Sequence, residues 1–252
     1  MERALLLSPR QSSRQTGGEW DRLYIGHEFC ERLLPSDQEI ESLVKDRSLP
    51  DKRSLVTPYV TQAGLERVQA LVRRFVEKEP IFDEVIINDW GVFRAIREHG
   101  GRRVLGRLLV RQLRDPRLVD VDCGAQELPG LSISDDFIRV IRDVFGISRI
   151  EMDTTPAELA AVSKELHVSL YRPFTYVTTT RLCPIANLDG KPAGISLVAD
   201  RCNFECVDHA YELRNELMGR TLYLYGNTIF YRNEEEGLPP LGPDRLVIQQ
   251  LP

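Results

Sequence analysis

Short apolar runs rich in β-branched and aromatic residues alternate along the chain with longer stretches in which apolar residues recur at helical spacing. Runs at residues 23–27 and 55–60 predict strands, and each precedes a predicted helix, at 37–45 and 62–77. The second helix carries its apolar residues on one face, namely Leu65, Val68, Leu71, Val72 and Phe75. The first quarter of the chain therefore predicts two consecutive βα units.

The same alternation continues to about residue 180. Further strands are predicted at 84–88, 103–106, 149–152 and 167–170, and further helices at 90–98, 137–145 and 156–166. Strands that alternate with helices are typical of a parallel sheet. We expect an α/β fold, a TIM-barrel-like (β/α) barrel that is either complete or incomplete.

The pattern changes after Arg181. A loop with three cysteines is followed by a predicted helix at 204–217 and by a hairpin, with strands at 221–225 and 228–231 and a turn at Gly226-Asn227. We expect three parts: an N-terminal tail (1–20), the barrel (21–180), and a cysteine-bearing cap (181–252).

Chemistry in such barrels sits where the strands end, at the C-terminal face. Polar residues or a cysteine follow, or end, the predicted strands at six positions: Cys30, Asn88, Asp89, Arg107, Asp153 and Tyr171. We expect Asn88 and Asp89 to contact a substrate. Asp89 could instead cap the helix that follows it. Arg107 is suited to bind a carboxylate or phosphate, whereas Arg114 and Arg117 are expected on a solvated face.

Composition narrows the class of protein. Hydrophobic residues make up 42% and charged residues 28%, which is typical of a packed globule. The apolar run at residues 4–7 is too brief for a signal peptide or a membrane span. We therefore expect a cytoplasmic protein, whose five cysteines serve metal binding or are buried rather than forming disulfides.

Four of the cysteines form a candidate metal site. Cys202 and Cys206 are close enough in sequence to hold one centre, Cys183 precedes them in a predicted loop, and Cys30 follows the first predicted strand. Four thiolates suit either a 4Fe–4S cluster or a tetrahedral zinc ion, and the spacing alone leaves both open. Structural zinc usually has two closely spaced pairs, so one remote cysteine with a later trio favours a cluster. Cys123 is expected to be a buried core thiol.

Three segments resemble the collagenase-like peptidase family U 32. They are residues 85–92 (VIINDWGV), residues 104–117 with Gly106-Arg107 at a strand end, and residues 171–183 (YRPFTYVTTTRLC). The chain is most similar to the iron–sulfur branch of that family, which acts in oxygen-independent ubiquinone hydroxylation. This resemblance implies a 4Fe–4S cluster on Cys30, Cys183, Cys202 and Cys206. The candidate substrate-binding residues are Asn88, Asp89, Arg107, Tyr171 and Arg181.

The resemblance also implies a function: part of an oxygen-independent hydroxylation system for a quinone precursor, together with a homologous family U 32 subunit. An alternative is hydroxylation of tRNA or rRNA, since other branches are similar to such enzymes. Residues 94–117 favour it with eight arginines against two acids, while the net charge of −5 opposes it. A third alternative is a non-catalytic, cluster-binding partner subunit. No motif for peptide hydrolysis occurs in the sequence.

Overall fold

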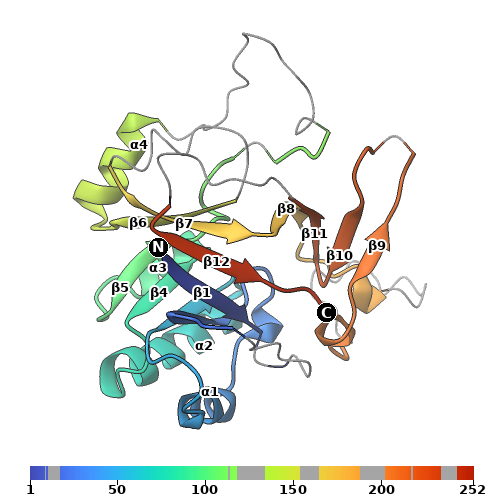
Figure 1. Cartoon of the computed structure of the whole chain (residues 1–252). Helices are drawn as coiled ribbons and strands as arrows, with labels where there is room; N and C mark the ends of the chain where they lie inside the picture. The colour runs from blue at the N-terminus through green and yellow to red at the C-terminus, as the bar shows by residue number, and fades with distance from the viewer. Residues whose placement is uncertain are drawn as a thin grey trace.

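Eight parallel strands close into a barrel in the computed structural model, with the order β1-β12-β7-β6-β5-β4-β3-β2 (Figure 1). The structure describes residues 1–8, 10, 18–112, 114–117, 134–153, 165–187, 202–216, 218–233 and 243–252. The barrel strands are β1 (Glu2–Leu7), β2 (Arg22–Gly26), β3 (Arg53–Thr57), β4 (Glu84–Ile87), β5 (Arg102–Leu105), β6 (Arg149–Asp153), β7 (His167–Arg172) and β12 (Arg245–Gln249). The expected TIM-barrel-like fold is confirmed, and the barrel is complete.

Helices on the outside connect consecutive strands. They are α1 (Asp37–Lys45), α2 (Gln62–Val72) with its π-helical extension η2 (Arg73–Lys78), α3 (Trp90–Ala95), and α4 (Asp135–Arg139) with its π-helical extension η3 (Val140–Val144). The start of α1 shows why these boundaries follow from sequence. Ser36 accepts from the backbone N–H of Glu39, and the Glu39 carboxylate accepts from the backbone N–H of Ser36, which is a capping box. Most of the predicted helix at 156–166, namely residues 156–164, lies outside the described residues.

The barrel extends beyond the expected range of 21–180. Strand β1 lies in the stretch expected to be a tail, and β12 lies in the stretch expected to be a cap. The two pair in parallel, with Leu5 opposite Ile248, and β1 also pairs with β2. A short apolar run that is too brief for a membrane span is long enough for a barrel strand, so residues 4–7 belong to the core.

A second sheet lies at the C-terminal ends of the barrel strands (Figure 1). It is antiparallel, with the order β8-β11-β10-β9, and consists of β8 (Phe174–Thr179), β9 (Tyr211–Leu213), β10 (Leu222–Tyr225) and β11 (Thr228–Arg232). The predicted hairpin is confirmed as β10 and β11. The predicted helix at 204–217 is wrong, because β9 pairs with β10 there and Phe204 has a left-handed backbone (φ 64°).

Apolar side chains form separate clusters in the two layers. One cluster fills the inside of the barrel with residues from seven strands: Ala4, Tyr24, Val56, Ile86, Val104, Tyr171 and Val247. Another joins the barrel to the second sheet through Phe29, Tyr176, Tyr225 and Phe230, whose rings contact one another. This second cluster fixes the sheet on the barrel, and the candidate site lies beside it.

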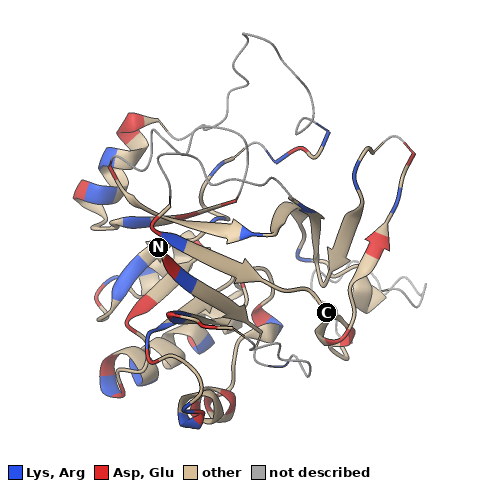
Figure 2. Cartoon of the chain, viewed as in Figure 1, with Lys and Arg blue, Asp and Glu red and all other residues tan. Residues whose placement is uncertain are grey.

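Charged residues of both signs lie along the helices and at the starts of the barrel strands (Figure 2). None of the helices in the described part of the chain is long and apolar enough to cross a membrane.

Candidate metal centre

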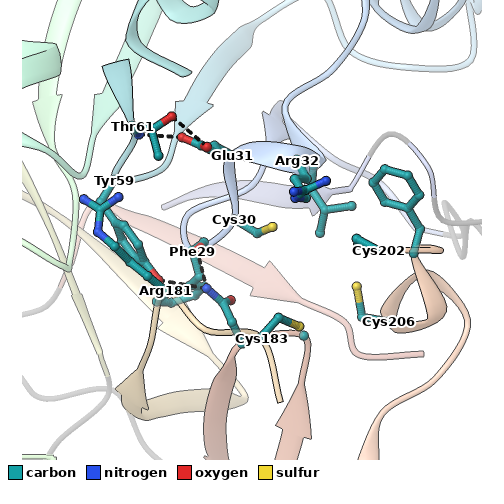
Figure 3. Close-up of a pocket in the computed structure, with 14 residues that line it drawn as sticks. Phe29, Cys30, Glu31, Arg32, Tyr59, Thr61, Arg181, Cys183, Cys202 and Cys206 are labelled. Carbon is teal, nitrogen blue, oxygen red and sulfur yellow. Dashed lines mark hydrogen bonds between the residues drawn. The ribbon is translucent and has the colours of Figure 1, made fainter. Parts of the chain in front are cut away.

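The four cysteines predicted as ligands line one cavity between the barrel and the second sheet (Figure 3). The cavity has a volume of about 390 Å³. All four thiols are free, and Cys206 is buried while the others are half-buried. Residues that are up to 176 positions apart in sequence thus share one space, as the prediction requires.

Short 3-10 helices position three of the thiols. Cys30 follows β2 and is the residue before η1 (Glu31–Leu33), whereas Cys183 follows β8 and shortly precedes η4 (Ile185–Asn187). Cys206 lies within η5 (Glu205–Val207). Each of these three thiols therefore lies in, or next to, a short 3-10 helix.

Backbone amides at the starts of two of these turns face the sulfurs. The N–H groups of Arg32 and Leu33 donate to Sγ of Cys30, and those of Ile185 and Ala186 donate to Sγ of Cys183. Hydrogen bonds of this kind favour the ionised sulfur, which is the form that binds metal. The turns are thus suited to thiolate ligands.

Burial favours the protonated form of three of the thiols when no metal is bound. Burial raises the pKa of Cys30 to about 11 and that of Cys206 to about 12, and it also raises the pKa of Cys183. A buried thiolate is costly unless a positive group compensates it. A bound metal supplies that charge and releases the thiol protons.

Two arginines lie at the edge of the cavity (Figure 3). The Arg181 guanidinium stacks over the Tyr59 ring at 5.0 Å and donates to the carbonyl of Val60, and Arg32 lines the same space. The neighbouring acid, Glu31, accepts from both the backbone N–H and the hydroxyl of Thr61, at 2.6 and 2.9 Å. The cavity therefore combines four thiols with two arginines. The carboxylate of Glu31 is already hydrogen-bonded to Thr61, the residue that caps α2.

The thiols surround a space rather than a point. Among the described residues, no group of three His, Cys, Asp or Glu side chains is already arranged to hold a single metal ion. Cys123, expected to be a core thiol, lies outside those residues.

The backbone of the loop that carries Cys30 is also hydrogen-bonded to a buried side chain. Nδ1 of His27 accepts from the backbone N–H groups of Phe29 and Cys30, both at 3.1 Å. Burial lowers the pKa of His27 to about 3, with Arg107 adding to the effect, so the imidazole is neutral and available as an acceptor. His27 thus holds the backbone of the Cys30 loop in place.

The barrel mouth is filled by an ion network rather than open to substrate. Arg107 is fully buried and bonds to Glu28, Asp153 and Gln249, at distances of 2.6 to 2.8 Å. Burial alone would lower its pKa, but the two carboxylates more than offset this, so the pKa of Arg107 lies above its ordinary value. Arg107 is engaged by protein groups, contrary to its expected role as a substrate ligand.

Arg114 and Arg117 differ from each other. Arg117 is exposed and pairs with Asp115, as expected for a solvated face. The Arg114 side chain is largely buried and bonds to Asp153 at 2.6 Å, with its guanidinium 4.2 Å from the Tyr176 ring. The expectation for Arg114 is therefore wrong, because the second sheet covers the segment that carries it.

The other candidate substrate residues serve the barrel, apart from Arg181. Asp89 caps α3 by accepting from Gly91 and Val92, so the capping interpretation is the one that the structure shows. Asn88 is buried and bonds to Thr57 and Leu108, and Tyr171 is buried in the barrel with its hydroxyl 2.8 Å from Glu151. Only Arg181 among the five lines the cysteine cavity.

Sequence reasoning missed several residues of the cavity. Tyr59, Thr61 and Asn227 line it together with Phe29, Arg32 and Phe204. Tyr59 and Thr61 follow β3, so the strand-end rule that selected Cys30 could have found them. Asn227 was recognised as a turn residue and gave no sign that its side chain points inward.

No family model matches the chain, and no curated protein or solved structure is significantly similar to it. The candidate metal centre therefore rests on the residues and the geometry of this chain.

Proposed function

We propose that the protein binds a 4Fe–4S cluster through Cys30, Cys183, Cys202 and Cys206. The single observation that carries this proposal is that all four thiols line one cavity, although they come from separate segments of the chain. Thiolates are the common ligands of such clusters. Free thiols in this number also fit a reducing compartment such as the cytoplasm.

The size of the cavity supports a cluster over a single zinc ion. With a Zn–S bond of about 2.3 Å, four sulfurs around one zinc lie roughly 3.8 Å from each other. The cavity that all four thiols line has a volume of about 390 Å³, which leaves room for a larger group. The surroundings also fit, because Arg32 and Arg181 offset the negative charge of four thiolates and the backbone amides of two turns face the sulfurs.

A cluster with cysteine on every iron would supply one-electron transfer or structural support rather than an open site for substrate. The filled barrel mouth favours the same role, since Arg107, Glu28 and Asp153 occupy the place where barrel enzymes usually bind substrate. We infer that the chain serves as the cluster-bearing component of an oxygen-independent hydroxylation system. A homologous family U 32 subunit and a quinone precursor, both suggested by the resemblance, are its proposed partners.

The hypothesis of RNA hydroxylation has less support. It rested on the arginine-rich segment 94–117, in which Arg107 and Arg114 are buried and Arg102 and Arg117 pair with acids. Four of the eight arginines are therefore already engaged within the protein. RNA binding that weakens steeply with added salt would restore this hypothesis.

Substitution of single cysteines tests the ligand set. In protein prepared without oxygen, Cys30→Ser, Cys183→Ser, Cys202→Ser and Cys206→Ser should each remove most of the iron, because each takes away one ligand. Cys123→Ser is the matched control and should keep the iron content of the natural protein. Equal iron in the Cys30 and Cys123 variants would contradict the proposed ligands.

A further inference from the structure

The turn of the β10–β11 hairpin reaches into the wall of the cysteine cavity. Asn227 lies in this turn with only 5% of its surface exposed. Its Nδ2 atom lies 2.7 Å from the carbonyl oxygen of Phe29, 2.7 Å from that of Thr180, and 2.8 Å from the hydroxyl oxygen of Tyr59. The two N–H groups of one side-chain amide thus face three oxygens from three different segments.

These acceptors belong to the segments that carry the cysteines. Phe29 directly precedes Cys30, and Thr180 lies in the turn that leads from β8 to Cys183. Beside Asn227, Gly226 lies against Cys206, since a Cβ atom at Gly226 would be 3.8 Å from both Cβ and Sγ of that cysteine. The turn therefore contacts the segments of three of the four proposed ligands.

The hydrogen-bond partners fix the orientation of the Asn227 amide. The carbonyls of Phe29 and Thr180 can only accept, so Nδ2 must be the atom that faces them, and Oδ1 lies on the other side, 3.3 Å from the hydroxyl oxygen of Thr228. The backbone N–H of Thr180 also donates to the carbonyl of Asn227 at 3.0 Å. A residue needed only for the turn would require none of these side-chain contacts.

We propose that Asn227 is a positioning residue, which holds the segments of Cys30, Cys183 and Cys206 at the separation that a shared cluster requires. This inference rests on the proposed function. The residue would not touch the cluster, and it would act through the backbone on either side of the ligands. Its effect should therefore be on the assembly and retention of the cluster.

The test compares Asn227→Asp with Asn88→Asp. An aspartate has the shape of asparagine but no N–H to donate, so at position 227 it would place an acceptor against the two carbonyl oxygens of Phe29 and Thr180. Asn88 is a matched control, because it is also buried and donates to a backbone carbonyl, that of Thr57, but it lies outside the cavity. Iron loss to a chelator, measured under nitrogen, should be about tenfold faster in Asn227→Asp than in the natural protein. The Asn88 variant should lose iron at the natural rate, even if its melting temperature falls.

Hydrogen exchange on metal-free protein gives a second readout. The backbone amides of Arg32, Leu33, Ile185 and Ala186 should exchange faster in Asn227→Asp and at the natural rate in Asn88→Asp. Unchanged iron retention together with unchanged exchange, or equal effects of the two substitutions, would overturn the inference. If the natural protein binds no iron, the proposed function fails, and the exchange pattern still decides whether Asn227 places the cysteine segments.

Discussion

Arg107 and Glu28 form a two-bonded ion pair across the mouth of the barrel, with Nε to Oε1 at 2.8 Å and Nη2 to Oε2 at 2.7 Å. Arg107 comes shortly after β5, and Glu28 comes after β2, two residues before Cys30. The pair therefore closes the mouth and fixes the start of the loop that carries a proposed ligand. It links the stability of the barrel to the placement of Cys30.

Loss of this pair should destabilise the fold. Arg107→Met keeps much of the side-chain volume but leaves Glu28 and Asp153 buried without their cation, so the free energy of unfolding should fall by about 3 to 5 kcal/mol. Arg117→Met, which removes an exposed and solvent-screened pair with Asp115, should leave the free energy of unfolding nearly unchanged. Urea denaturation measures both, and similar values for the two variants would show that the network contributes little.

A buried acid inside the barrel predicts a pH dependence. Burial raises the pKa of Glu151 to about 8 from an ordinary 4.5, so the folded protein keeps a proton there that the unfolded chain releases. The stability that this proton contributes is fully present below pH 4.5 and is lost as the pH rises through 8.

Glu151→Gln mimics the protonated acid and should remove this dependence. At pH 7 the variant should be more stable than the natural protein by about 3 kcal/mol, and the difference should shrink towards zero near pH 4.5. Urea denaturation at the two pH values checks this. A difference that does not change with pH would mean that Glu151 is not protonated in the folded state.

The cations at the cavity edge should influence the reduction potential of a bound cluster. A positive charge favours the reduced, more negative state, so Arg181→Gln should lower the midpoint potential by on the order of 40 mV, equal to about 1 kcal/mol. Arg94→Gln, on the exposed surface of α3, is the control and should leave it unchanged. Equal potentials in the natural protein and both variants would remove Arg181 from the electrostatics of the site.

Local signals predicted much of the fold. The ends of α1 match the prediction because a capping box marks its start, and the hairpin follows from its Gly226-Asn227 turn. The strands that the sequence did not predict are those that depend on pairing with strands far away in the sequence. Residues 4–7 form a strand because β12, which is far away in sequence, lies beside them, and residues 211–213 pair with β10 instead of continuing a helix.

Some features of the candidate site could likewise be predicted from local sequence, and others depend on long-range packing. The position of Cys30 follows from the rule that loops after barrel strands gather at one face. The inward orientation of Asn227 and the burial of Arg107 and Arg114 depend on how the second sheet packs on the barrel, which no local pattern encodes. Residue chemistry therefore predicted the cysteines that share the cavity, and tertiary packing determined which arginines bond to protein groups.

The count of iron and acid-labile sulfide in protein purified without oxygen tests the central claim most directly. Four cysteine ligands around one 4Fe–4S cluster predict about four irons and about four sulfides per chain, with a brown colour that air bleaches. One zinc per chain with no sulfide, or protein without any metal after anaerobic reconstitution, would contradict it.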